Sequence, residues 1–194
     1  MPVDFPSTPA TGETYTSGDR TWKYNGTAWD AFTSTSSGLT LIKAQTVGSA
    51  VSSVTLTSVF SATYDSYRIT MNYVLSSATD PGIYVTLGST ATGYYGATAY
   101  WAYDTSGDGT AKRNNGTEWN WGYFGANQTS GSWDILYPFK TNRTAYNGHS
   151  SGDLYLTTTS GWLGNNTSYT DIKFAPSTGT LTGGVIRVYG YSNS

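Results

Sequence analysis

The stretch Tyr169-Thr-Asp-Ile-Lys-Phe-Ala-Pro-Ser-Thr-Gly-Thr-Leu-Thr-Gly-Gly-Val-Ile-Arg-Val-Tyr-Gly-Tyr191 decides the fold class of this chain. Two short apolar runs, 172–174 and 185–189, flank a connection rich in Ser, Thr and Gly, which predicts a β-hairpin with a longer loop. Side chains alternate along a strand. Those expected to face a core are Ile172, Phe174, Ile186 and Val188, and those expected to face solvent are Lys173, Arg187, Tyr189 and Tyr191. The chain is therefore expected to end inside a sheet of a sandwich or barrel.

Composition favours strands and argues against several classes of partner. Charged residues make up 11% of the 194 residues and the net charge is −2, so no phosphate-binding surface and no nucleic-acid partner are expected. Seventeen Tyr, seven Trp and 23 Gly favour strands joined by turns, with almost no helix. Neither a secretory signal nor an apolar run of membrane-spanning length is present, so membrane insertion is not expected. Cysteine is absent, which makes oligomerisation the expected source of extra stability.

The body of the chain, residues 39–194, is predicted to be a jelly-roll-type β-sandwich, which makes the protein all-β. Apolar alternation predicts strands at 39–47, 53–57, 67–75, 83–87, 97–103, 118–124, 133–139, 153–159, 171–174 and 185–191. Turn signals lie at 80–82, 106–109, 114–116, 147–148 and 161–166.

Residues 1–32 are predicted to form a separate anchor segment that contains a hairpin. If Asn25-Gly26 is a two-residue loop, Trp22 pairs with Trp29 across the strands. So small a hairpin is marginal alone, and we expect it to dock on another chain through Phe5, Trp22, Tyr24 and Trp29. The alternative is that it packs on its own domain. Residues 33–38 predict a flexible linker.

Two aromatic stretches are candidates for a binding surface. One contains Trp119, Trp121 and Tyr123, which alternation places on one face, and the other contains Tyr95, Tyr100 and Trp101. Exposed rings of this kind form platforms for the apolar face of a sugar or for another subunit. The alternative interpretation is that they are core residues in a chain with few Leu and Met.

No combination of residues predicts catalysis, a metal site or a cofactor, so we expect a protein that is not an enzyme. His149 lies in a turn-like segment and is expected to be an exposed polar residue. Glu118 and Asp134 are the one pair of carboxylates that could act as a glycosidase pair. The segment 104–109 resembles part of a calcium loop, but Asn115 stands where the bidentate Glu should follow, so a polar turn is the better interpretation.

Two parts of the sequence resemble bacteriophage structural proteins. Phe5-Pro-Ser-Thr-Pro-Ala-Thr-Gly12, followed by Thr21-Trp-Lys-Tyr-Asn-Gly-Thr-Ala-Trp29, is similar to the start of tail-fibre and other virion proteins, especially of phages that infect cyanobacteria. Residues 54–69, with 172–174 and 179–190, resemble jelly-roll domains of phage structural proteins. The resemblance implies a non-enzymatic virion component, a homotrimer, that is anchored by its N-terminal segment and projects its jelly roll outward.

Three functions remain open at this point. A short tail fibre or fibre tip would dock on other virion proteins through residues 1–32 and touch host surface glycans with its aromatic clusters. A capsid decoration protein would instead bind and stabilise the head shell. A free carbohydrate-binding module, from a different class, would be monomeric and would bind glycans without any particle.

Overall fold

The computed structural model describes residues 3–18, 20–32, 38–104 and 107–192. The chain divides into two compact units, a small one within residues 1–37 and a large one within residues 38–193. The predicted linker, 33–38, lies outside the described residues except for Gly38. Each unit is described by itself below.

The small unit is a three-stranded antiparallel sheet made of β1 (Thr14–Ser17), β2 (Arg20–Tyr24) and β3 (Trp29–Phe32). The predicted two-residue loop is wrong, because Tyr24 pairs with Trp29, and Trp22 pairs with Ala31. Asn25 explains the difference. Its side-chain Oδ1 accepts hydrogen bonds from the backbone N–H groups of Thr27 and Ala28, both at 2.8 Å, and so closes a four-residue loop.

The large unit consists of strands and their connections. Its strands are β4 (Leu39–Thr46), β5 (Val54–Leu56), β6 (Ser66–Asn72), β7 (Leu75–Ser76), β8 (Gly82–Leu87), β9 (Tyr94–Ala102), β10 (Gly109–Gly116), β11 (Trp119–Tyr123), β12 (Thr129–Leu136), β13 (Ala145–Gly152), β14 (Tyr155–Leu163), β15 (Ile172–Pro176), β16 (Leu181–Thr182) and β17 (Val185–Tyr191). No helix occurs among the described residues, and hence none that could span a membrane.

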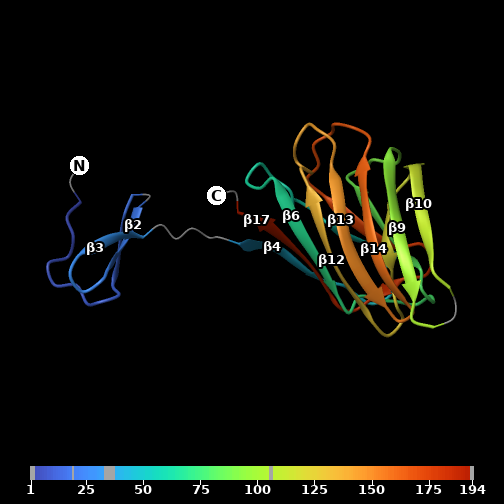
Figure 1. The fold of residues 1–194 in the computed structure, drawn as a ribbon, viewed down its shortest axis with the longest axis horizontal. Helices are drawn as coiled ribbons and strands as arrows, with labels where there is room; N and C mark the ends of the chain where they lie inside the picture. Colours follow the sequence, from blue (N-terminus) through green and yellow to red (C-terminus); the bar gives the residue numbers. More distant parts are fainter. Residues whose placement is uncertain (1–2, 19, 33–37, 105–106, 193–194) are drawn as a thin grey trace. The chain divides into compact units, whose positions relative to one another are not determined.

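These strands form the predicted jelly-roll sandwich, and the all-β fold class is confirmed. One sheet has eight strands in the order β10-β9-β14-β13-β12-β6-β17-β4, which lie side by side in Figure 1. The other has four strands in the order β11-β8-β15-β5, and every pairing is antiparallel. Strands β4, β17, β6 and β12 with these four have the connectivity of a double-sheet jelly roll.

Four further strands are inserted into this jelly roll and widen one of its sheets. Strands β9 and β10 come between β8 and β11, and strands β13 and β14 come between β12 and β15. All four join the large sheet beyond β12. Strand β11 of the small sheet lies against β9, β13 and β14, so the inserted strands share the main core on their inner face.

The closing stretch alternates as predicted, but it is not a hairpin. Ile172, Phe174, Ile186 and Val188 are buried in the core. However, β15 pairs with β5 and β8 in the small sheet, whereas β17 pairs with β4 and β6 in the large one. The Ser-, Thr- and Gly-rich connection crosses from one sheet to the other, and its β16 is held by β7 instead.

Two of the inserted strands, β10 and β13, contain segments that the sequence predicts as turns, 114–116 and 147–148. The reason is that each segment contains an Asn-Gly pair, which is a strong turn signal. In β13, Gly148 is needed for packing: a Cβ there would lie 2.3 Å from the indole Cδ1 of Trp133 on the neighbouring strand. In β10, Asn115 has a positive φ of 56° where the register with β9 shifts, so the signal marks a bulge.

Candidate functional site

The structure removes two of the predicted aromatic residues from any binding surface. The side chains of Trp119 and Trp121 on β11 are fully buried, so a role in binding a glycan or another subunit is wrong for them and the core interpretation is correct. Both indoles pack against Tyr146 of β13, with ring centroids 4.7 and 5.1 Å apart. They support the inserted strands from inside.

Two more of the predicted residues, Tyr100 and Tyr123, are partly buried in a cluster with Tyr155. Tyr100 meets Tyr123 edge-on with ring centroids 5.3 Å apart, and Tyr155 lies 5.2 and 4.8 Å from the two rings. Burial raises the pKa of the Tyr123 hydroxyl above its ordinary value. The three rings are partly exposed and use part of their surface to pack on one another.

The outer face of the eight-stranded sheet carries the candidate site. Strand register places one row of side chains straight across this face, and most of them are small or polar. The row consists of Thr110, Ala99, Thr158, His149, Ser132, Thr70, Arg187 and Ala44. Because alternate residues point to opposite faces, the bulky partners of these residues are buried underneath.

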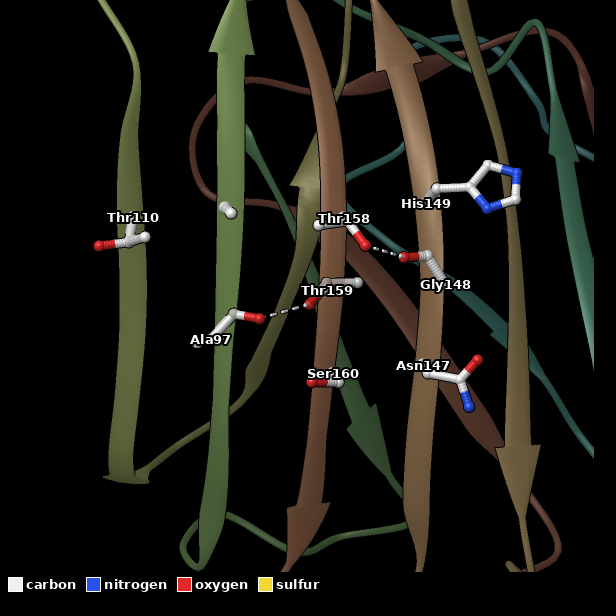
Figure 2. A pocket seen from close by; sticks show the side chains of 9 residues that line it. Ala97, Thr110, Asn147, Gly148, His149, Thr158, Thr159 and Ser160 are labelled. Carbon is white, nitrogen blue, oxygen red and sulfur yellow. Dashed lines mark hydrogen bonds between the residues drawn. The ribbon is translucent and has the colours of Figure 1, made fainter.

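A hollow of about 470 Å³ lies on this face over the four inserted strands. Figure 2 shows the residues that line it, which are Ala97, Ala99, Thr110, Asn147, Gly148, His149, Thr158, Thr159 and Ser160. We call it the outer trough. The side chain of Ala97 on β9 is short, whereas Asn147 and His149 on β13 are longer, so the trough follows β9 and β14. A second hollow of about 340 Å³ adjoins it, and His149 lines both.

Aromatic side chains stand at both ends of the outer trough. Trp101 of β9 is 44% exposed, and it lies beside the exposed Leu156 of β14. At the other end, Trp162 of β14 is stacked on Tyr95 of β9, with centroids 4.2 Å apart and planes at 13°. The guanidinium of Arg143 lies 4.7 Å from the centre of the Trp162 ring. Tyr95 and Trp101 were predicted as candidates, whereas Trp162 was missed.

The carboxylates predicted as a glycosidase pair are each held by an arginine of their own. Glu118 accepts a hydrogen bond from Arg113 at 3.2 Å. Asp134, on the outer face of β12, accepts two hydrogen bonds from Arg68 at 2.8 Å and one from the Tyr191 hydroxyl at 2.6 Å. This is not the arrangement of an acid and a base flanking one sugar ring.

Opposing effects set the ionisation of this network. Burial pushes the pKa of the Asp134 carboxyl upward, but the hydrogen bonds from Arg68 and Tyr191 outweigh burial and lower that pKa below its ordinary value. Burial, together with the hydrogen bond to Asp134, raises the pKa of Tyr191 to about 12. Asp134 therefore remains charged and paired at neutral pH.

Two other positions considered in the sequence form neither a catalytic nor a metal site. His149 is exposed, as expected, but lies within β13 rather than in a turn. Of the segment 104–109, which resembles part of a calcium loop, residues 105 and 106 lie outside the described residues. Asp108 in this segment accepts a hydrogen bond from the backbone N–H of Ala102 at 3.1 Å, as expected for a polar turn. Within residues 3–18, 20–32, 38–104 and 107–192, no cluster of three His, Asp or Glu residues has metal-site geometry.

The predicted anchor residues come together in the small unit. The Phe5 ring stacks on Trp29 with centroids 5.2 Å apart and meets Trp22 and Tyr15 edge-on at 5.3 and 5.6 Å. Tyr24 lies 5.4 Å from Trp29. All five rings remain partly exposed. Beside Tyr24 is a hollow of about 380 Å³, lined by Thr11, Gly12, Lys23, Tyr24, Asn25, Asp30 and Ala31.

Comparison with known proteins assigns no family to this arrangement. No protein-family model matches the chain, and no curated protein matches it significantly.

Proposed function

We propose that this chain is a non-enzymatic attachment protein of a bacteriophage particle, of the short tail-fibre or fibre-tip type. The small unit docks on another virion protein, and the jelly roll faces the host and binds its surface glycans. The observation that carries this proposal is that each of the two units has its own candidate binding surface. The small unit presents partly exposed rings, and the large unit presents an open, hydroxyl-lined sheet face.

The aromatic cluster of the small unit supports its role as the anchor. Phe5, Tyr15, Trp22 and Trp29 pack on one another, yet each keeps part of its surface in solvent. Large aromatic side chains at the centre of a patch usually dominate the energy of protein interfaces. A partner protein that covers these rings would bury apolar surface that the three short strands leave exposed.

Self-association is the second part of the proposal, with a homotrimer as the expected assembly. Strand β4 is an edge strand of the large sheet, and its Leu39 and Leu41 are 42% and 52% exposed. Exposed edges with apolar side chains are sites at which other chains add. Symmetric packing of copies would cover these leucines without disulfides.

Labelling of intact particles with an antibody against the jelly roll, viewed by electron microscopy, tests the location. Label at the tail tips supports the attachment function. Label spread over the head shell would contradict it and favour capsid decoration. Particles without label would contradict both, and glycan binding by the free monomer would then identify a free carbohydrate-binding module.

A further inference from the structure

We propose that the outer trough is the glycan site and that it takes an extended, neutral oligosaccharide lying along β9 and β14. This inference rests on the proposed attachment function and makes its ligand specific. The proposed site lies on the four strands inserted into the jelly roll. It includes His149 and is bounded by Trp162, and the sequence did not indicate either residue as part of a binding site.

The floor of the trough fits the edge of a sugar chain. Ala97 and Ala99 leave space, and the hydroxyls of Thr158 and Ser160 line the strand beside them. The amide of Asn147 and the imidazole of His149 stand along one side, as Figure 2 shows. These groups both donate and accept hydrogen bonds, which is what the hydroxyl groups of a sugar require.

The two ends of the trough carry different aromatic side chains, so the site is asymmetric along its length. Trp101 is exposed and offers an indole surface on which the apolar face of a sugar ring can stack. Trp162 is 37% exposed, but Tyr95 stacks on its ring and Arg143 lies 4.7 Å from its centre, so these contacts hold it as a fixed wall. Tyr95 and Trp101 are six residues apart on one strand, which is about 20 Å. The site is therefore long enough for several sugar units.

The charge of the trough points to a neutral ligand. Of the nine residues that line it, His149 is the one ionisable side chain. In the next row, Asp134 is the strand partner of Asn147 and is already paired with Arg68. Lys112 of β10 is the exposed strand partner of Ala97 in that row. An acidic glycan would need several cations inside the trough to replace its hydration, whereas the permanent cations Lys112 and Arg143 lie at its rim and at its Trp162 end.

A second protein chain fits the trough less well than a glycan does. Peptides commonly bind a sheet by adding a strand to its free edge. Strands β9 and β14 lie within the sheet and pair with neighbours on both sides, so their backbone groups are already used. The lining is also rich in hydroxyl groups rather than in large apolar side chains, which form the centres of protein interfaces.

The test uses the full chain and linear neutral oligosaccharides, from monosaccharides to hexasaccharides, with sialylated and sulfated glycans as the acidic set. Affinity is measured by titration calorimetry. We expect neutral oligosaccharides to bind, with affinity that rises with chain length until the trough is filled. Ala97→Arg places a long side chain in the trough and should weaken binding by about tenfold or more. Trp101→Ala should weaken it by up to about tenfold.

Matched variants keep the result specific. Ala62→Arg adds the same side chain at an exposed alanine in the connection between β5 and β6, and Tyr137→Ala removes an aromatic ring that is 41% exposed in a turn. Both should bind like the unsubstituted chain. The proposal is overturned if no neutral oligosaccharide binds, if acidic glycans bind better, or if Ala97→Arg changes oligomeric state and not glycan affinity. Glycan binding without label on the tail would overturn the attachment function and leave the site standing.

Discussion

At the scale of single residues, the outer face of the large sheet combines one fixed charge network with one open trough. Asp134 shows how the fixed part works, because three hydrogen bonds hold its carboxylate against the cost of burial. The same three bonds tie β6, β12 and β17 together across the sheet. In the trough, Thr158 donates a 3.4 Å hydrogen bond to the Gly148 carbonyl, whereas the side chains of Asn147, His149 and Ser160 are exposed and can turn toward a ligand.

Replacing Asp134 tests this network and has a defined pH dependence. A carboxyl group whose pKa is lowered by folding contributes stability above its unfolded pKa, about 4, and loses that contribution as the pH falls through the lowered value. We expect Asp134→Asn to reduce the free energy of unfolding by about 1 kcal/mol at pH 7. The difference from the unsubstituted chain should shrink below pH 4. Urea unfolding at a series of pH values measures it.

Asp65→Asn is the matched control for this change. Asp65 bonds Lys140 at 2.8 Å with both side chains well exposed, so the substitution should cost less. A constant difference between Asp134→Asn and the unsubstituted chain from pH 7 down to pH 2 would contradict the account.

The two tryptophans at the ends of the trough should respond differently to removal. Trp162→Ala breaks the stack with Tyr95 and Arg143 and should lower the free energy of unfolding by about 2 kcal/mol. Trp101→Ala removes a ring that is 44% exposed and should lower the free energy of unfolding by about 1 kcal/mol, which is less than the loss for Trp162→Ala. Denaturant unfolding of the two purified variants checks both values, and an equal loss would refute the assigned roles.

At the scale of elements, the small unit has a core of its own made of rings. The three strands are short, and a sheet of this size needs an apolar face to be stable. Phe5, although it precedes β1, supplies the ring that joins Trp22 to Trp29. This explains why one extended segment and two hairpin turns can form a compact unit.

Removal of the indole rings of Trp22 and Trp29 should unfold the small unit and leave the large unit folded. Each Trp→Ala change removes a partly exposed ring together with its aromatic contacts and should cost about 1.5 kcal/mol. The two changes together cost more than three short strands can withstand. Hydrogen exchange on the Trp22→Ala, Trp29→Ala double variant should show lost protection in β2 and unchanged protection in β6 and β17. The double variant should also fail to enter particles. Normal incorporation would contradict the anchor role.

Most strands of the jelly roll could be predicted from sequence, because alternation of buried and exposed residues is a local signal. Alternation placed Ile186 and Val188 in the core, which the structure confirms. Their pairing partners could not be predicted, since nothing local indicates that 172–174 and 185–191 join different sheets. Asn147 and Gly148 mimicked a turn because the need for glycine came from Trp133, a contact between strands. For the same reason the trough was missed, as its residues come from four strands.

At the scale of the whole molecule, the two units divide the proposed function between them. The inserted strands β9, β10, β13 and β14 carry the outer trough, while the jelly roll beneath them supplies the core. Loops and insertions on a rigid scaffold are where binding sites commonly lie. The small unit is compact by itself, so the proposed docking through it need not disturb the sheet that carries the proposed glycan site.

Adsorption of phage particles to host cells, measured in the presence of excess purified chain, tests whether the outer trough attaches the particle to its host. The unsubstituted chain should occupy the host glycans and reduce adsorption, whereas Ala97→Arg should leave adsorption unchanged and Ala62→Arg should act like the unsubstituted chain. No reduction by the unsubstituted chain, or an equal reduction by Ala97→Arg, would contradict the claim that the outer trough attaches the particle to its host.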